Sequence, residues 1–298
     1  MRNVLAAFVD RQAELGRFCE MLENDEKPIM IVWGDDGIGK SSFLARLIHE
    51  CASRKLRKTE VFVSKDRFNS YLEILRKIRD DLGPELFPNF TQLVNYFFPN
   101  PLQPRAPVKI DIAGGAQSVL ERAKLENVTI HGDVAGIIIK DCMINVPDPT
   151  MNIPPRDRMN LLTTEFLKDL APIVQKEMLI VLFDDTQELT EETHKWLWAG
   201  LISSLEEGRL KNIRFVLCGR NKPQLEGAVA LSVKEAPLQP LGLPDIETYL
   251  ERSGHVDDGR AAVAQMLLAA SSGIPLKIAL QLDSYFQLFP DKRARVNG

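Results

Sequence analysis

Apolar residues along the chain occur either in short uninterrupted runs or at helical spacing. Continuous apolar runs at 29–33 and 178–183 have the length of strands that are buried on both faces of a parallel sheet. Further strands are predicted at 59–64, 213–218 and 231–233. Helical repeats separate these runs, so the pattern predicts alternating strands and helices up to about residue 240.

The helical repeats predict helices at 12–24, 41–52, 71–82, 90–98, 158–175, 191–207, 245–252, 259–270 and 274–288. The last three follow one another without a strand between them. We therefore expect an α/β domain at 1–240, with a mostly parallel sheet flanked by helices. A small, all-helical lid domain is expected at 241–298.

The segment 99–155 has a different composition, because it is rich in proline, glycine and β-branched residues. Short strand-like pieces occur at 108–112, 127–130 and 137–146, and glycines between them indicate turns or a hairpin. We interpret this segment as an insertion within the α/β domain or as a flexible connection.

Composition narrows the class of protein only slightly. The 298 residues are 45% hydrophobic and 26% charged, and the net charge of -4 gives no global electrostatic reason to expect nucleic acid. No apolar stretch reaches membrane-spanning length. The four cysteines form no CxxC pair, so we expect reduced structural thiols, no zinc site and a cytoplasmic location; they are Cys19, Cys51, Cys142 and Cys218.

The segment Gly34–Ser41 carries the chemistry that can be interpreted most directly. It reads Gly-Asp-Asp-Gly-Ile-Gly-Lys-Ser, which fits the phosphate-loop pattern G-x-x-x-x-G-K-[ST] between a predicted strand and a predicted helix. Glycines let backbone N–H groups approach phosphates, Lys40 reaches the β and γ phosphates, and Ser41 binds magnesium. We therefore predict bound ATP or ADP with Mg²⁺, contacted by Gly34, Asp35, Asp36, Gly37, Ile38, Gly39, Lys40, Ser41 and Ser42.

Polar residues follow two of the later strands. Asp184 and Asp185 end the run 178–183, so Asp184 is predicted to associate with magnesium and Asp185 to polarise an attacking water. Glu188 competes with Asp185 for that catalytic role. Arg220 follows the strand at 213–218 and is predicted to stabilise γ-phosphate charge. The alternative interpretations are an ordinary acidic turn and a solvated arginine.

These residues resemble the STAND class of signal-transduction P-loop NTPases, relatives of AAA+ proteins. The resemblance covers about residues 8–98 and 158–288 and includes Phe-Val-Asp-Arg-Gln-Ala-Glu-Leu at 8–15, which is similar to the F-V-G-R-E-x-E-L segment of the class. Asp10 stands where that segment has glycine. The resemblance also includes the phosphate loop, the paired aspartates, Arg220, Leu-Gln-Pro-Leu at 238–241 and Gly-Ile-Pro-Leu at 273–276. It implies that Val9, Arg11 and Pro275 lie against the nucleotide.

The resemblance further implies a switch between an ADP-bound resting form, in which the lid is closed, and an ATP-bound form that assembles. Hydrolysis would be slow, and the hinge would lie near 235–245. We expect a homo-oligomer, or a sensor or effector protein supplied in trans or by a further part of the chain, in bacterial defence or stress signalling. No membrane partner is expected.

Two other functions compete with this interpretation. One is an AAA+-like ATPase that acts on DNA, as in origin-recognition relatives; basic clusters at 54–58 and 292–295 favour it, whereas the acidic net charge opposes it. The other is a non-hydrolysing scaffold whose nucleotide is structural. We do not favour a nucleic-acid partner, and we expect a regulatory ATPase.

Overall fold

The structure is a computed structural model that describes residues 9, 11–23, 26–98, 153–206, 210–225, 227–254 and 259–289. The strand-like pieces predicted between residues 99 and 152, Cys142 and the basic cluster at 292–295 lie outside the described residues.

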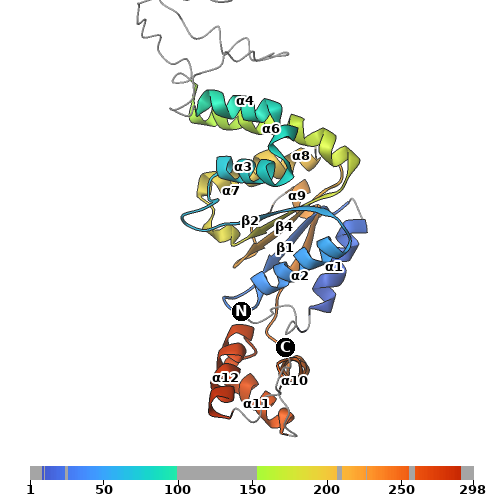
Figure 1. The fold of residues 1–298 in the computed structure, drawn as a ribbon, viewed down its shortest axis with the longest axis vertical. Helices are drawn as coiled ribbons and strands as arrows, with labels where there is room; N and C mark the ends of the chain where they lie inside the picture. Colours follow the sequence, from blue (N-terminus) through green and yellow to red (C-terminus); the bar gives the residue numbers. More distant parts are fainter. Residues whose placement is uncertain are drawn as a thin grey trace, which may run out of the picture.

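Five parallel strands form one sheet at the centre of the larger part of the molecule (Figure 1). Their order across the sheet is β2-β3-β4-β1-β5. The strands are β1 (Ile29–Trp33), β2 (Arg57–Phe62), β3 (Leu179–Asp184), β4 (Ile213–Gly219) and β5 (Val233–Pro237). With helices on both faces, this sheet confirms the predicted α/β class.

The two faces of the sheet form separate hydrophobic cores. In β1, Ile29 and Ile31 point into one core, whereas Met30 and Val32 point into the other. This alternation explains why the central strands read as continuous apolar runs, since both of their faces are covered. The core with Met30 is closed by α1 (Gln12–Glu23) and α2 (Lys40–Ser53).

The opposite core is larger and is covered by two successive layers of helices (Figure 1). The elements on this side are α3 (Tyr71–Leu82), a 3₁₀ turn (Pro84–Leu86), α4 (Pro88–Phe97), α6 (Pro155–Lys176), α7 (Glu191–Trp196), a π-helical turn (Leu197–Ile202), α8 (Ser203–Glu206) and α9 (Ala228–Leu231). The outer layer consists of α4 and α6. They pack through Phe166 of α6, whose ring centroid lies 5.0 Å from that of Phe87 and 5.3 Å from that of Phe90.

Three helices form the predicted lid beyond one end of the sheet (Figure 1). They are α10 (Leu243–Arg252), α11 (Arg260–Ser271) and α12 (Pro275–Leu288). Their own small core contains Ile246, Leu267 and Ile278, and Val9 from the amino-terminal segment packs into it. The lid therefore contacts the amino-terminal segment through Val9, in addition to its covalent connection from β5 to α10.

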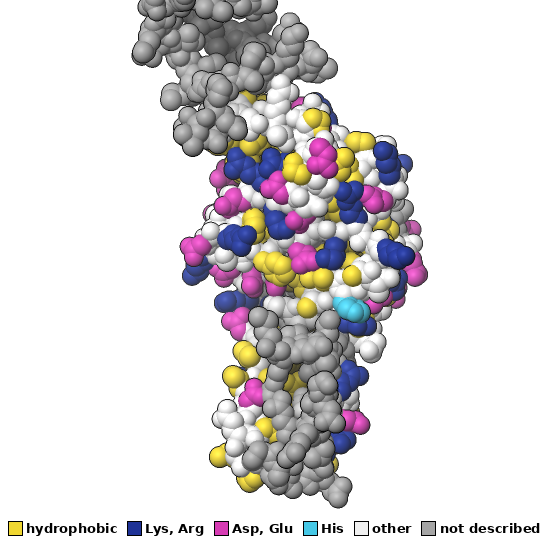
Figure 2. Space-filling model, in the orientation of Figure 1, with side chains coloured by type: hydrophobic (Ala, Val, Ile, Leu, Met, Phe, Trp, Pro, Cys, Tyr) yellow, Lys and Arg dark blue, Asp and Glu magenta, His cyan; other side chains and the backbone are white. Residues whose placement is uncertain are grey.

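Charged side chains of both signs are interspersed over the face of the α/β part in Figure 2. Across the described residues, no helix has the length and apolar character needed to cross a membrane.

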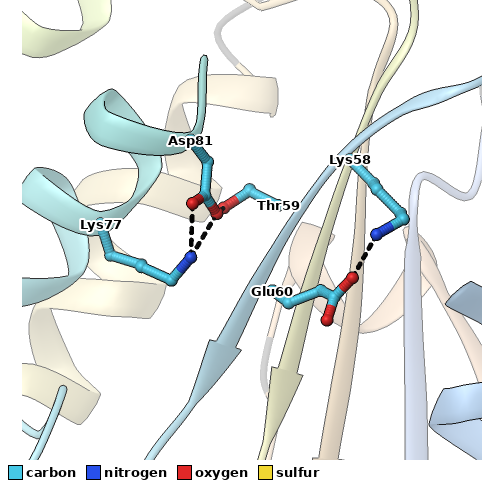
Figure 3. Close-up of polar contacts among 5 residues, drawn as sticks. All are labelled: Lys58, Thr59, Glu60, Lys77 and Asp81. Carbon is cyan, nitrogen blue, oxygen red and sulfur yellow. Dashed lines mark hydrogen bonds and ion pairs between the residues drawn. The ribbon is translucent and has the colours of Figure 1, made fainter. Parts of the chain in front are cut away.

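The edge strand β2 is fastened to α3 by polar contacts (Figure 3). The Thr59 hydroxyl donates to Asp81 Oδ2 at 2.6 Å, and Lys77 Nζ donates to the same oxygen at 2.6 Å. Lys58 and Glu60 form an ion pair along the strand itself. Charges at an exposed edge oppose pairing with a further strand, so β2 ends the sheet.

The other edge strand differs from the prediction. A strand was expected at 231–233, but Leu231 ends the short helix α9, and β5 runs from Val233 to Pro237. The reason is that β5 has only β1 as a neighbour, so that Lys234 and Glu235 reach the protein surface and interrupt the apolar pattern. The helix predicted at 191–207 is interrupted by the π-helical turn at Leu197–Ile202.

Candidate nucleotide-binding site

The carboxyl ends of three neighbouring strands bring the predicted site residues to one edge of the sheet. In the observed register Trp33 pairs with Gly219, and Phe183 pairs with Leu217. Because β4 lies between β1 and β3, Arg220 lies between the phosphate loop and the aspartates that end β3.

The phosphate loop joins β1 to α2 and depends on two glycines. Gly37 and Gly39 have φ angles of 79° and 98°, in the left-handed region that glycine adopts without a side-chain clash. A Cβ atom at Gly37 would lie 2.9 Å from Leu276 Cβ in the lid. Gly37 therefore permits both the turn of the loop and the close approach of α12.

The side chain of Lys40 lies inside the curve of the loop and is only 7% exposed. Its Nζ donates to the carbonyl oxygens of Gly34 at 2.7 Å and of Asp35 at 2.9 Å. The ammonium group is thus held at the start of α2, where the partial positive charge of a helix amino terminus adds to its own charge.

Asp184 and Ser41 form an oxygen pair at the base of the loop. Asp184 is 4% exposed, and burial raises the pKa of its carboxyl group, while a hydrogen bond from the Ser41 hydroxyl acts in the opposite direction. Hydroxyl and carboxylate oxygens are ligands that Mg²⁺ accepts. In the described part of the chain, no group of three or more His, Cys, Asp or Glu side chains could hold a metal ion by itself.

Asp185 follows Asp184 and lines a cavity that Ser41 also lines. Its backbone is left-handed, with φ 53°, and its N–H group donates to Asp184 Oδ1 at 3.0 Å. Glu188 donates its backbone N–H group to the Asp185 carbonyl at 2.9 Å but is not among the residues that line the cavity. Of the two candidates for the catalytic carboxylate, only Asp185 faces the space beside Ser41.

Arg220 binds the phosphate loop at the protein surface. Its Nε lies 3.0 Å from Asp36 Oδ1, and its backbone N–H group donates to Gln187 Oε1 at 3.1 Å. Its side chain lines a second, neighbouring cavity of about 390 Å³ together with Thr186 and Gln187.

The cavity lined by Asp185, the candidate nucleotide cavity, has a volume of about 560 Å³ and is also lined by residues of the phosphate loop and the lid. Most of the residues predicted to contact nucleotide line it, namely Val9, Arg11, Asp36, Gly37, Ile38, Gly39, Lys40, Ser41, Ser42, Asp185 and Pro275. Five predicted site residues lie outside its lining, namely Gly34, Asp35, Asp184, Glu188 and Arg220.

Sequence reasoning missed the remaining lining residues, which are Leu241, Tyr249, Leu276, Ala279, Leu280 and Asp283. Four of them recur on α12 at spacings of three or four residues, so they share one helical face. That spacing is the sequence signal from which these four residues of α12 could have been predicted.

Arg11 fastens the amino-terminal segment to both the loop and the hinge. The residue is 4% exposed, and its Nη2 donates to the carbonyl oxygens of Ile38 at 3.2 Å and Gln239 at 2.7 Å. Its guanidinium therefore bonds the phosphate loop to the chain that leads into the lid.

Backbone hydrogen bonds join the lid to the phosphate loop and to the segment that follows β5. The Leu276 N–H group donates to the Gly37 carbonyl at 3.1 Å, and the Leu241 N–H group donates to the Gly273 carbonyl at 2.8 Å. Pro275 lies over the loop, since its Cγ would be 3.9 Å from a Cβ atom at Gly39. The amino terminus of α12 thus contacts the phosphate loop directly.

The parallel sheet, the phosphate loop between β1 and α2, and the acidic end of β3 together define a P-loop NTPase fold with a helical lid. The structure is similar to that of Cdc6p from Pyrobaculum aerophilum, with a TM-score of 0.52 and 13% identity over 96% of this chain. The chain spans 65% of the length of that protein. At this identity the similarity shows the fold alone.

Two other structures are similar at lower scores. One is a Signal Transduction ATPase with Numerous Domains from Pyrococcus horikoshii, with TM-score 0.43, 13% identity and coverage of 91% of this chain and 29% of that chain. The other is domain III of the Thermotoga maritima replication initiation protein DnaA, with TM-score 0.44, 13% identity and coverage of 97% and 90%. No protein-family model and no curated protein sequence matches the chain.

Proposed function

We propose that this chain is an ATP- and ADP-binding regulatory switch of the STAND kind, with slow ATP hydrolysis that controls nucleotide-dependent association. The observation that carries the proposal is the hydrogen bond from the Leu276 N–H group to the Gly37 carbonyl. Because this bond joins the lid to the loop that would hold the phosphates, a change at the γ-phosphate is transmitted directly to the position of the lid.

The proposed chemistry is attack of a water oxygen on the γ-phosphorus. The bond between that phosphorus and the bridging oxygen of ADP breaks, and the water proton passes to Asp185, which leaves ADP and inorganic phosphate. Lys40 binds the β and γ oxygens, while Ser41 and Asp184 would hold Mg²⁺, which neutralises phosphate charge when it is bound. Asp185 is the proposed catalytic carboxylate because it lines the nucleotide cavity, whereas Glu188 does not.

Slow hydrolysis is supported by the surroundings of Arg220. Its guanidinium is paired with Asp36, so contact with the γ-phosphate requires that this ion pair first be exchanged. Turning Arg220 from Asp36 to the γ-phosphate is therefore a separate conformational step before the chemical step, which favours a long-lived nucleotide state.

The hinge of the proposed switch comprises residues 238–242, between β5 and α10. Leu238 donates its N–H group to the Trp33 carbonyl at 2.8 Å and so belongs to the sheet, whereas Leu241 is bonded to Gly273 in the lid. The few residues between these two anchors are those whose backbone angles change if the lid moves.

An ATPase that acts on DNA is the alternative, and the basic cluster at 54–58 is the observation that favours it. The interspersed charges on the face in Figure 2 do not favour it. DNA-stimulated hydrolysis, with binding that weakens steeply as salt is raised, would support this alternative over the switch.

The test combines nucleotide identification with mass measurement. We expect the purified protein to carry ADP, and its mass by light scattering to increase with a non-hydrolysable ATP analogue but not with ADP. Lys40→Ala should abolish both properties, whereas Lys195→Ala should retain them, since the Lys195 side chain is 74% exposed and forms an ion pair with Glu191 of its own helix. Unchanged nucleotide retention in Lys40→Ala would refute the proposal. Retained nucleotide with no turnover would identify the non-hydrolysing scaffold.

A further inference from the structure

The side chain of Gln187 joins the ends of β3 and β4. Its Nε2 donates to Asp185 Oδ1 at 2.8 Å, and its Oε1 accepts the backbone N–H group of Arg220 at 3.1 Å. One side chain therefore contacts the carboxylate that faces the nucleotide cavity and the backbone of the arginine beside the phosphate loop.

The chemistry of the two partners determines the orientation of this amide. A backbone N–H group only donates, and an ionised carboxylate only accepts, so a reversed amide would break both hydrogen bonds. A glutamate at this position would lack the donor, and a leucine would lack both groups. Glutamine combines a donor and an acceptor at the required reach.

The turn around Gln187 makes close contacts with β4. Thr186 Oγ1 donates to the Cys218 carbonyl at 3.0 Å, and a Cβ atom at Gly219 would lie 2.7 Å from Thr186 Oγ1. The turn is thus packed closely against the end of β4. Because these contacts hold the backbone of the turn, the direction of the Asp185 carboxylate is determined mainly by its hydrogen bond with the Gln187 side chain.

We propose that Gln187 is a positioning residue that holds the Asp185 carboxylate toward the attacking water and couples it to Arg220. This inference rests on the proposed function of Asp185. Gln187 lines the second cavity, whereas Asp185 lines the nucleotide cavity. The Gln187 side chain thus acts from outside the nucleotide cavity, without touching the nucleotide.

The first test is Gln187→Leu, which removes both hydrogen bonds and keeps a similar side-chain volume. Because the variant leaves the phosphate loop intact, we expect the affinity for a fluorescent ADP to stay within about twofold. We expect kcat for ATP hydrolysis to fall about tenfold to a hundredfold, which is at or below the lower end of the roughly 10²- to 10⁴-fold that a general base contributes, because Asp185 is misplaced and not removed. Gln224→Leu, an exposed glutamine after β4, is the matched control and should change neither value.

The second test separates positioning from a purely structural role. Single-turnover hydrolysis with excess enzyme is measured for Gln187→Leu, Asp185→Asn and the double variant. If Gln187 acts through Asp185, adding Gln187→Leu to Asp185→Asn costs no further rate. Equal losses in both backgrounds, or a wild-type rate in Gln187→Leu, would overturn the inference. Absence of turnover in the wild type, or retention of nucleotide by Lys40→Ala, would instead count against the proposed function.

Discussion

The Arg220 Nε atom lies 3.0 Å from Asp36 Oδ1, so the end of β4 is bonded to the phosphate loop. Both side chains are largely exposed, at 52% and 71%, and an ion pair of this kind contributes little to stability. In the proposed switch, the Asp36 carboxylate and the γ-phosphate compete for the Arg220 guanidinium.

Arg220→Gln should therefore discriminate between nucleotides. We expect the affinity for a non-hydrolysable ATP analogue to fall about tenfold, equivalent to about 1.4 kcal/mol, while the affinity for ADP stays within about twofold. Isothermal titration calorimetry measures both values. Asp36→Asn is the control, because it removes the competing carboxylate and should keep or increase the affinity for the analogue. Equal losses for both nucleotides in Arg220→Gln would contradict this role.

Gly273→Ala should release the lid. Gly273 has a φ of 73°, and an added Cβ would lie 2.4 Å from the Leu241 carbonyl oxygen, so the substitution combines backbone strain with a clash against the hinge. Gly227→Ala is a matched control, since its φ is 66° but nothing lies within 4 Å of the added atom. We expect the control to lose about 1–2 kcal/mol of stability from strain alone.

The readout for this pair is hydrogen exchange. We expect faster exchange across α10, α11 and α12 in Gly273→Ala, with the sheet unchanged, and no such local effect in Gly227→Ala. The same exchange pattern in both variants would show that strain alone, and not the contact with Leu241, accounts for the effect.

Arg11→Met should destabilise the protein while keeping most of the apolar stem of the side chain. The Ile38 and Gln239 carbonyls would lose a charged donor, which costs about 1–3 kcal/mol of the free energy of unfolding. Arg17→Met is the control, because Arg17 also donates to a carbonyl, that of Glu235, but at an exposed position. Arg17→Met should lower the free energy of unfolding by no more than about 0.5 kcal/mol. Urea unfolding measures the free energy of unfolding of both variants. Equal losses would contradict the role of Arg11 in bonding the phosphate loop to the chain that leads into the lid.

Cysteine reactivity tests the core beneath α2. Burial raises the pKa of the Cys51 thiol to about 11, from an ordinary value of 9.0, and also raises that of Cys218. At pH 9 about one Cys51 in a hundred is then thiolate, so alkylation should modify the half-buried Cys19 well before Cys51. Mass spectrometry of peptides measures the order. Rapid labelling of Cys51 in the folded protein would contradict the packing.

The raised pKa of Cys51 also makes the free energy of unfolding depend on pH. The folded state keeps the Cys51 proton up to about pH 11, whereas the unfolded chain releases it near 9.0. Stability from this group is therefore present below pH 9 and is lost as the pH rises through 11. Cys51→Ala should remove this part of the alkaline loss.

Much of the fold could be predicted because its central strands are buried on both faces. The runs that became β1 and β3 are uninterrupted and apolar for that reason, and β4 is interrupted only by Arg214, whose buried Nε donates to the Met21 carbonyl. The edge strand β5 was displaced in the prediction because Lys234 and Glu235 reach the surface. Local periodicity does not indicate which strand will lie at an edge, since that depends on the order of the whole sheet.

The candidate site could be predicted only where its chemistry is local. The phosphate loop is a contiguous motif, and Asp184 follows directly from the strand that precedes it. Tyr249 was not predicted, because the part of α10 that lines the cavity depends on the geometry of the chain between β5 and α10. Gln187 was also missed, since its role depends on the neighbouring strand β4. The functions assigned to all these residues stay predictions.

The pairing of α4 with α6 has a consequence for protein engineering. Asp169 on α6 accepts hydrogen bonds from the Asn89 side chain and from the Phe90 N–H group, and the two helices lie side by side at the end of the molecule remote from the lid (Figure 1). A fluorescent reporter attached to the exposed Asn95 of α4 would therefore lie at the end of the molecule remote from the lid (Figure 1), and the nucleotide cavity and the hinge would keep their native sequence.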